Sequence, residues 1–545
     1  MSELLYNGIE LPVEWPPRNI HPSSRYIMRV PYLEAVQKTL PIDTGRQLFV
    51  DDFLIESTSM TRVFHQASKY TGNPVFSPAT KWEKNEDTPP CTIPKCGGVW
   101  YDERDGIFKM WYMASYLGCM CYATSQDGIH WDRPELDVVP GTNIILPLEI
   151  HPDSGTVWID RETSDKNARY KMLIREPNPE GEPSIPGLMM ISADGIHWSD
   201  PVKSGYMHDR STMFYNPFRK KWVQSIRSWV NPGGRYRHYW EHADFFESGE
   251  WQITPRLWDF RDVKEPVAWA GADYMDKAGE SEPQLYNLDA VAYESLMISF
   301  FQILQGPPNQ FGEALGLPKL TELTPAYSRD GFHWYRPDRR MFISANRTAG
   351  SWEYGYVEST GGLCLVVGDE LWFYYSAYAG DFKRSNRHWS NNGMYANGAV
   401  GLAKLRRDGF ASMQAKIPGA TLTTKPVTFK GKHLFVNAMT AGSELAVEVL
   451  NKAGEVMAGF TTEQCHAFCG NSTCAEITWS GVSLESLAGS EVAFRFSMDR
   501  GEIYSFWVSP DASGASYGYV GAGGPGFKSS RDTVGKGLSP CHTKK

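Results

Sequence analysis

The chain has 545 residues, more than one ordinary hydrophobic core contains, so we expect at least two domains. Its net charge of -9 offers no basic surface to a polyanion, which argues against nucleic acid as a partner. No run of about 18 apolar residues is present, so no membrane span is predicted. Aromatic residues form 13% of the chain, which favours strands and supplies flat surfaces for sugar rings.

The beginning of the chain and its cysteines favour a cytoplasmic protein. Residues 1–10 show no basic segment followed by an apolar one, so no signal peptide is visible, although secretion stays open. Nine cysteines are an odd number, which suits reduced thiols better than a disulfide framework. Cys465, Cys469 and Cys474 lack the paired spacing of a zinc site, so we expect no metal and no cofactor. No pattern indicates the oligomeric state.

Residues 1–83 are predicted to form an N-terminal arm followed by a pair of strands. The stretch up to about residue 45 is irregular and rich in proline, which indicates a wrapping arm rather than a domain. Residues 48–55 and 61–65 read as two short strands. Such a pair would close the ring of sheets predicted below or pack on its edge.

One heptapeptide occurs three times in the middle of the chain. It reads Ser-Gln-Asp-Gly-Ile-His-Trp at 125–131, Ser-Ala-Asp-Gly-Ile-His-Trp at 192–198 and Ser-Arg-Asp-Gly-Phe-His-Trp at 328–334. Asp-Gly favours a tight hairpin turn, because glycine adopts a positive φ without strain. We expect the aspartates to accept hydrogen bonds from their own turns and the tryptophans to pack between sheets, so this repeat is structural rather than catalytic.

The spacing of the heptapeptide predicts five repeated units. Asp127 and Asp194 lie 67 residues apart, and Asp194 and Asp330 lie 136 apart, which leaves room for one degenerate copy. Residues 243–251 fit that copy, and residues 407–410 are the remnant of a last one. Each unit has room for four short strands, and radial repetition of such units is typical of a β-propeller. A five-bladed β-propeller is therefore predicted at 84–415.

The pattern changes after residue 415. Short apolar segments at 434–437, 444–450 and 503–508 alternate with turn residues, as in a β-sandwich. We therefore predict a second domain at 416–510 and an all-β fold class for the whole chain. Residues 511–545 are rich in glycine and serine and end on basic residues, which predicts a flexible tail.

The repeat and the layout resemble the five-bladed β-propeller glycoside hydrolases, the superfamily that includes families 32, 43, 62, 68 and 130. Those enzymes end their blades in a hairpin similar to the heptapeptide, and family 32 enzymes add a C-terminal β-sandwich. The resemblance covers residues 84–510 and implies a glycoside hydrolase that acts on a small oligosaccharide or terminal sugar. Insertions at 303–322 and 378–397 would narrow the central funnel and favour exo-action.

Glycoside hydrolysis requires two carboxyl groups that flank the scissile bond. Acidic residues just ahead of the innermost strand of each blade point into the funnel of a propeller, so they are the catalytic candidates. They are Asp153, Asp209, Glu282, Glu353 and Glu358, with Asp153 and Asp209 as the first pair. One group would protonate the leaving oxygen, and the other would act as base or nucleophile.

The resemblance implies roles by position. An Asp ahead of blade one is nucleophile or base, an Asp ahead of blade two stabilises the transition state, and a Glu near blade three is the acid. Asp153 matches the second position, and Asp209 lies near the third as Asp rather than Glu. The position ahead of blade one differs from the pattern of the resembled families, because residues 91–96 contain no carboxylate. Either other blades supply the missing group, or the propeller has lost this chemistry.

Further side chains are expected to bind a carbohydrate substrate. Arginine binds carboxylates and hydroxyls through its planar fork, and aromatic rings stack on sugars. The substrate-binding candidates are Arg175, Glu176, Arg210, Arg227, Trp229, Tyr286, Trp352 and Tyr356. A furanoside similar to a fructoside or an arabinoside is favoured.

Two alternatives stay open. The first is an inverting phosphorylase that resembles family 130, in which phosphate replaces the attacking carboxylate. It would explain the missing carboxylate of blade one, and it requires a cluster of basic side chains in the funnel. The second is a propeller that binds carbohydrate without catalysis. The sequence names neither the sugar nor its linkage, because these depend on loop shapes that no motif records.

Overall fold

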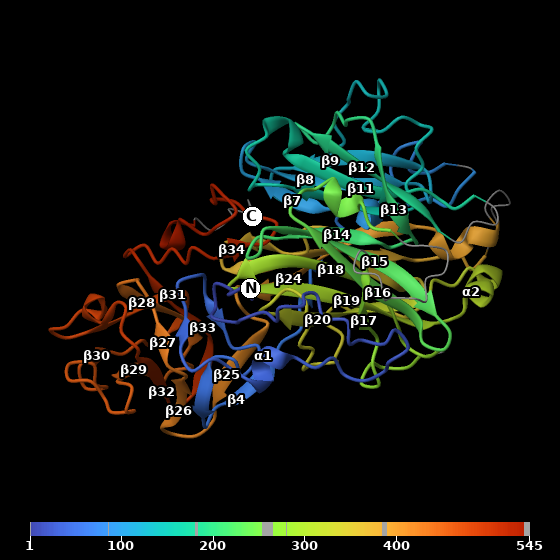
Figure 1. Cartoon of the computed structure of the whole chain (residues 1–545). Coiled ribbons are helices and arrows are strands. Elements are labelled where there is room, and N and C mark those ends of the chain that lie inside the picture. The colour runs from blue at the N-terminus through green and yellow to red at the C-terminus, as the bar shows by residue number, and fades with distance from the viewer. Residues whose placement is uncertain are drawn as a thin grey trace.

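The computed structural model describes residues 2–85, 87–179, 184–252, 265–279, 281–383 and 390–538. Regular structure in these ranges is almost entirely β, which confirms that the chain is all-β as predicted (Figure 1). The helices are short: α1 (Pro31–Glu34), α2 (Asn309–Leu315), and the 3-10 turns η1 (Pro94–Cys96), η2 (Lys166–Ala168), η3 (Glu247–Gly249), η4 (Ser390–Tyr395), η5 (Leu484–Leu487) and η6 (Gly535–Gly537). Every helix among these residues falls short of the length and apolar content of a membrane span.

Five antiparallel sheets follow one another along the chain. The first contains β6 (Thr92–Ile93), β7 (Val99–Asp102), β8 (Ile107–Ala114) and β9 (Cys119–Ser125). The second contains β10 (Ser154–Ile159), β11 (Tyr170–Arg175), β12 (Ile185–Ser192) and β13 (Val202–Met207). The third contains β14 (Thr212–Asn216), β15 (Lys221–Val230), β16 (Gly234–His242) and β17 (Val267–Gly271).

The last two of these sheets each include a strand from a distant part of the chain. The fourth contains β18 (Gln284–Glu294), β19 (Leu296–Gly306), β20 (Leu320–Ser328) and the C-terminal β34 (Tyr519–Val520). The fifth contains β21 (Gly355–Ser359), β22 (Leu365–Val367), β23 (Glu370–Tyr378), β24 (Gly398–Arg406) and the N-terminal β5 (Ser68–Lys69).

The five sheets close into a ring. Strand β10 contacts β14, β14 contacts β18, and β21 contacts the strands of the fourth sheet. The fifth sheet returns to the first where Gly98 and Gly361 form a parallel bridge. The first and second sheets are joined by Trp100, whose Nε1 donates a hydrogen bond to the Val157 carbonyl at 3.0 Å. Strands β7, β10 and β14 begin at the same end of the ring, because Arg210, ahead of β14, donates hydrogen bonds to Ser154 at the start of β10 and to the Lys95 carbonyl ahead of β7.

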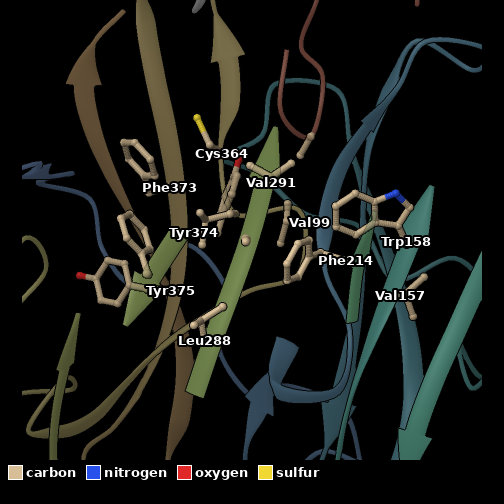
Figure 2. Packing of buried hydrophobic residues seen from close by; sticks show 14 of the residues in the cluster. Val99, Val157, Trp158, Phe214, Leu288, Val291, Cys364, Phe373, Tyr374 and Tyr375 are labelled. Atoms are coloured by element: carbon tan, nitrogen blue, oxygen red, sulfur yellow. The ribbon is translucent and has the colours of Figure 1, made fainter. Parts of the chain in front are cut away.

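The sheets meet in one apolar core. Val99 of β7, Val157 of β10, Phe214 of β14, Leu288 of β18 and Phe373 of β23 are fully buried members of one apolar cluster (Figure 2). Apolar burial of this kind is the dominant stabilising term in folding. It holds the first strands in place, and with them the residues that precede each strand.

The heptapeptides form the predicted hairpin turns. Gly128 has a φ of +75°, which only glycine adopts without strain. One oxygen of Asp127 accepts hydrogen bonds from the amides of Ile129 and His130, both at 2.8 Å. Burial alone would raise the pKa of Asp127, but these bonds and the His130 ring lower it to about 2. Equivalent bonds form in the other two copies, so the structural role of the repeat is confirmed.

The same turns also join neighbouring sheets. In three places an aromatic side chain of one sheet donates a hydrogen bond to a carbonyl inside the heptapeptide of the next. The pairs are Trp111 with Gly195, Tyr374 with Gly128, and Trp269 with Phe332. Each heptapeptide therefore contributes both to its own turn and to the cohesion of the ring.

Two further sheets lie beside the ring and share a second apolar core (Figure 1, lower left). One contains β2 (Gln47–Leu48), β4 (Thr61–Phe64), β25 (Ala411–Ala415), β28 (His433–Met439), β30 (Cys465–His466), β31 (Asn471–Trp479) and β33 (Gly501–Ser509). The other contains β3 (Ile55–Thr58), β26 (Ala420–Thr424), β29 (Leu445–Leu450) and β32 (Ala493–Met498). Phe494 and Phe496 of β32 contact Phe506 of β33 across the two sheets.

The N-terminal strands belong to these two sheets and do not close the ring. β3 pairs with β26, which follows the predicted 84–415 domain. β4 pairs with β25, so the last five residues of that predicted domain belong to the outer sheets instead. A short β1 (Leu40–Pro41) likewise pairs with β27 (Val427–Thr428). Only β5 packs on the edge of the ring, beside β24. The proline-rich arm lies against the third and fourth sheets, where Tyr6 stacks on Phe218 and Asn7 donates to the Arg329 carbonyl.

The C-terminal segment differs from the predicted flexible tail at 511–545. Up to residue 538 it is packed, and Ala515, Val520 and Ala522 are fully buried. β34 pairs with β18 of the ring. The glycines permit close packing: a Cβ on Gly524 would lie 1.7 Å from the Val366 carbonyl oxygen. High glycine content here reflects contact between backbones rather than disorder. Residues 539–545 lie outside the described residues.

A buried ionic network connects the ring to the two outer sheets. Arg46, ahead of β2, pairs with Glu294 at the end of β18 and with Asp408. Arg407 pairs with Glu294 and, at 2.7 Å, with Asp532 of the C-terminal segment. All five side chains are at most 2% exposed. The last remnant of the repeat, at 407–410, thus serves as a junction between the parts of the molecule.

Candidate active site

Asp153 and Asp209 lie beside each other at the end of the ring where the first strands begin. Asp153 directly precedes β10, and Asp209 stands three residues ahead of β14. The backbone amide of Arg210 donates to Ser154 Oγ at 2.8 Å, so the residues that follow the two aspartates are hydrogen-bonded to each other. The ring brings the residues ahead of β10 and β14 together, at the place that the sequence predicted for residues ahead of innermost strands.

Asp153 lies between two cations. Arg175 Nη1 donates to one carboxylate oxygen at 2.6 Å, and Lys95 Nζ lies 3.4 Å from the other. Lys95 belongs to η1, just ahead of β7, where the resemblance leads one to expect a catalytic carboxylate. Burial alone would lower the pKa of Lys95, yet Asp153 and Glu358 raise it above its ordinary value. A permanent positive charge therefore occupies the first position.

Asp209 is held by an arginine and a tyrosine. Arg227 Nη2 lies 2.8 Å from one carboxylate oxygen, and the Tyr286 hydroxyl donates to the other at 3.0 Å. Burial would raise the pKa of Asp209, but Arg227, Lys95 and further arginines hold it well below its usual range. Burial raises the pKa of Tyr286, so its hydroxyl keeps the proton that it donates. Asp209 is thus an ionised carboxylate at neutral pH.

Glu358 and Arg210 lie deeper and support this site. Both side chains are 1% exposed and face each other at 3.9 Å. The guanidinium of Arg210 donates to the Lys95 carbonyl and to Gln302 Oε1. Because these bonds occupy Arg210, we assign it to positioning of the Lys95 and Asp209 loops rather than to direct contact with a substrate.

A group of tyrosines adjoins the charged side chains. Tyr356, in β21, lies 6.4 Å from the Tyr286 ring, and its hydroxyl donates to that of Tyr395 at 3.3 Å. Tyr395 stacks on Tyr116 with ring centroids 4.0 Å apart. Tyr395 comes from η4, which packs on α2, so the insertions at 303–322 and 378–397 both reach the site. Flat rings with polar edges suit recognition of a sugar.

Two predicted binding residues flank this group. Trp229 is 47% exposed and lies opposite Arg235 in the register of β15 and β16. Glu176 directly follows Arg175, which donates a hydrogen bond to the Glu176 carbonyl. The Glu176 side chain is half-buried, and its carboxylate has no hydrogen bond or ion pair to any residue that the structure describes.

Three other candidates lie away from this cluster. Glu282 is 87% exposed on its side chain and pairs with Arg25 of the N-terminal arm. Glu353 pairs with Lys69 of β5 and accepts a hydrogen bond from Tyr375. Trp352 packs on the same Tyr375 ring. Glu282 and Glu353 therefore do not join the network around Asp153, because Glu282 pairs with the N-terminal arm and the buried Glu353 pairs with β5.

Sequence reasoning missed four cations of the site. Lys95 stands ahead of β7 as Asp153 stands ahead of β10, so its position in the sequence could have indicated it. Arg237 is fully buried and donates to the carbonyls of Arg210 and Tyr286, which fixes two of the loops. The remaining two are Arg235 and Lys319, which contact the Tyr286 ring. No local signal marks them, because strand pairing alone brings them here.

The site offers no cluster of metal ligands. Among the residues that the structure describes, no three His, Cys, Asp or Glu side chains are arranged to hold a metal ion. What the arrangement provides is ionised carboxylates, an excess of cations and several tyrosine hydroxyls. These groups suit acid–base chemistry on a polar, hydroxylated or anionic ligand.

Comparisons with known proteins give structural likenesses only. No family model and no curated protein matches the chain. Among solved structures, an N-acetylgalactosamine deacetylase from F. plautii in complex with blood group B trisaccharide is similar at 15% identity, with TM-score 0.43 over 63% of this chain and 96% of its own. A glycosyl hydrolase from Bacteroides ovatus is similar at 14% identity, with TM-score 0.39 over 63% and 94% of the two chains.

A further likeness covers more of the chain. A family 43 arabinoxylan arabinofuranohydrolase from Bacillus subtilis, in complex with cellotetraose, is similar at 10% identity, with TM-score 0.35 over 81% of this chain and 98% of its own. Identities and TM-scores are low in all three cases. These likenesses assign no activity to the chain.

Proposed function

We propose that the protein is a carbohydrate-active enzyme that cleaves glycosidic bonds, built on a five-bladed β-propeller joined to a β-sandwich. The closed ring of five sheets and the shared core of the two outer sheets support this architecture. One observation carries the activity. Asp153 and Asp209 stand just ahead of the neighbouring strands β10 and β14, and both belong to a single network of cations and tyrosines.

Asp209 acts as the base or nucleophile in this proposal. Its carboxylate stays ionised at neutral pH because Arg227 and Lys95 outweigh the effect of burial on its pKa. An ionised carboxylate takes a proton from an attacking water or stabilises the positive charge that develops at the anomeric carbon. Asp153, paired with Arg175 and Lys95, contributes negative charge beside it.

Glu176 is the proposed proton donor to the leaving oxygen. Asp209 stays ionised beside Arg227 and Lys95, and Asp153 is ion-paired with Arg175 and Lys95, so both carboxylates are already engaged by cations. Glu176 follows Arg175, next to Asp153, and its carboxylate has no hydrogen bond or ion pair to any described residue. Its side chain is therefore the carboxyl group of this network that is free to contact a leaving oxygen.

The insertions favour action at the end of a glycan. α2 and η4 pack on each other, and η4 places Tyr395 against Tyr116 and Tyr356. These contacts cover one side of the charged cluster. We therefore propose exo-action on a small oligosaccharide or terminal glycoside, with the furanosides as the first substrates to try.

Phosphorolysis is the second candidate, because the cluster is rich in cations. Lys95 replaces the expected carboxylate of the first blade, and Arg227, Arg235 and Lys319 lie around Asp209. In this version inorganic phosphate attacks the anomeric carbon, the glycosidic bond breaks, and the leaving oxygen takes a proton. Hydrolysis differs only in that water attacks.

The test is release of aryl alcohol from a panel of aryl furanosides and pyranosides, with and without phosphate. Turnover independent of phosphate and lost in Asp153→Asn and Asp209→Asn supports hydrolysis, and turnover that requires phosphate supports phosphorolysis. Glu176→Gln should slow cleavage of unactivated glycosides by about 100-fold or more and spare activated aryl leaving groups, which need no proton. Glycan binding without any turnover, unchanged in the aspartate variants, would contradict both and indicate a binding propeller.

A further inference from the structure

Lys319 is a buried lysine without an anionic partner. It is 2% exposed and stands just ahead of β20, where its carbonyl accepts a hydrogen bond from the Tyr356 amide. Its ammonium lies 5.7 Å from the Tyr356 ring and 6.0 Å from the Tyr286 ring. The ammonium makes no hydrogen bond or ion pair with any described residue. Burial of an unpaired ammonium is costly, so the site requires an explanation.

The other buried lysines of the described chain are all paired with carboxylates. Lys95 faces Asp153, Lys109 contacts Asp102, and Lys171 contacts Asp160. Of the four buried lysines among the described residues, Lys319 alone lacks such a partner. Buried lysines in this fold are therefore paired with carboxylates, and Lys319 departs from that rule.

Further unpaired donors lie around the same tyrosine. The Arg235 guanidinium is 5.0 Å from the Tyr286 ring, and its Nη1 donates to Gln284. The Nε atoms of Arg235 and Arg227 are buried and have no hydrogen-bond partner. Lys319, Arg235 and Arg227 carry three positive charges, and among the described residues Asp209 is the carboxylate that pairs with one of them, Arg227. The local charge is positive although the chain as a whole carries -9.

We propose that Lys319 and Arg235 bind an acidic group on the substrate, a carboxylate or a sulfate carried by the sugar. This inference rests on the proposed function, since it names the substrate class of the same site. An oxyanion would accept hydrogen bonds from the Lys319 ammonium and from the free Arg235 Nε, in place of the missing protein carboxylate. The adjoining rings of Tyr286 and Tyr356 would pack against the sugar. Uronic acids and sulfated sugars then bind in preference to neutral ones.

Free phosphate could satisfy the same donors, so the test separates the two sources. Calorimetry would measure binding of glucuronate, galacturonate, their neutral counterparts glucose and galactose, a sulfated galactose, and inorganic phosphate alone. The proteins are wild type, Lys319→Met, Lys319→Arg, and Lys452→Met as a control that removes an exposed charge away from the site. We expect the acidic sugars to bind at least about 10-fold more tightly than the neutral ones. That preference should vanish in Lys319→Met and persist in Lys319→Arg and Lys452→Met.

The unfolding temperature of Lys319→Met gives a second test. If Lys319 served only to stabilise the fold, its removal would lower this temperature rather than raise it. Because Lys319→Met removes an unpaired buried charge, the variant should unfold at a higher temperature than wild type. A lower unfolding temperature would overturn the assignment of Lys319 to ligand binding. Equal affinity for acidic and neutral sugars would also overturn it, as would binding of phosphate alone through Lys319.

The outcomes distinguish this inference from the proposed function. Glycoside cleavage by a wild-type protein that binds acidic and neutral sugars equally would support the function and overturn the inference. Acidic sugars that bind through Lys319, with no glycoside cleaved, would support the inference and contradict the function.

Discussion

The surroundings of the site favour the charged form of Asp209 and the neutral form of Lys319. Asp209 has cations around it that hold its pKa well below the usual range. Burial and the neighbouring Arg235 lower the pKa of Lys319 to about 7, which Asp209 only partly offsets. The site thus keeps a fixed negative charge beside a positive charge that titrates near neutral pH. Charged neighbours of Lys319 are Arg235, Arg227, Asp209 and Glu313.

The affinity for an acidic sugar should therefore depend on pH. Lys319 is protonated below pH 7 and loses its charge above it, while a uronate stays ionised throughout. We expect affinity to be level below about pH 6 and to fall by up to about tenfold per pH unit above 7. Calorimetry from pH 6 to 9 measures this. Lys319→Met and Lys319→Arg should both give flat profiles over pH 6 to 8, and a sloped profile in Lys319→Met would assign the titration to another group.

At the scale of elements, the heptapeptide turn is the unit that the fold repeats. Its three copies make the same hydrogen bonds but differ in burial: the Asp330 side chain is 4% exposed, and that of Asp194 is 47% exposed. Asp330 accepts hydrogen bonds from two turn amides and from the His333 ring. Loss of the carboxylate would leave these donors unsatisfied, which costs more in the interior than at the surface.

Asp330→Ala should therefore destabilise the protein by about 2 to 3 kcal/mol, and Asp194→Ala by about 1 kcal/mol. Denaturant unfolding followed by tryptophan fluorescence compares the two matched variants. Equal losses would show that burial does not govern the contribution of the turn.

Local features of the chain were predictable, and long-range pairing was not. The Asp-Gly turns follow from glycine's tolerance of positive φ, and the placement of Asp153 and Asp209 follows from the repeat. β3 and β4 join sheets built mainly from C-terminal strands, and neither segment has a pattern that names its partner. The packed segment at 511–538 has the composition of a flexible tail, because glycine serves both disorder and close backbone contact. Lys319 reaches Tyr286 only through the pairing of sheets.

For the molecule as a whole, the buried ionic network joins parts that are distant in sequence. Arg407 contacts Glu294 of the ring and Asp532 of the C-terminal segment, 125 residues away. Ser505 of β33 donates to Asp408 in the same network. A buried pair contributes little net stability when intact, but removal of one partner leaves a buried charge without compensation.

Arg407→Leu should lower the free energy of unfolding by about 3 to 5 kcal/mol and expose the C-terminal segment to proteases. Lys452→Met, which breaks an exposed pair with Glu491, should change it by less than about 1 kcal/mol. Thermal unfolding and limited proteolysis measure both effects. An Arg407→Leu protein as stable as wild type would show that the ring and the outer sheets do not depend on this network.

The most direct test of the account is cleavage of a mixed pool of neutral and acidic oligosaccharides, followed by mass spectrometry. Wild type should release a sugar from at least one member of the pool. Asp209→Asn should lose this activity by about 100-fold or more, and Glu282→Gln, which changes an exposed carboxylate outside the cluster, should keep it. An Asp209→Asn protein that cleaves as fast as wild type would contradict the assignment of the site.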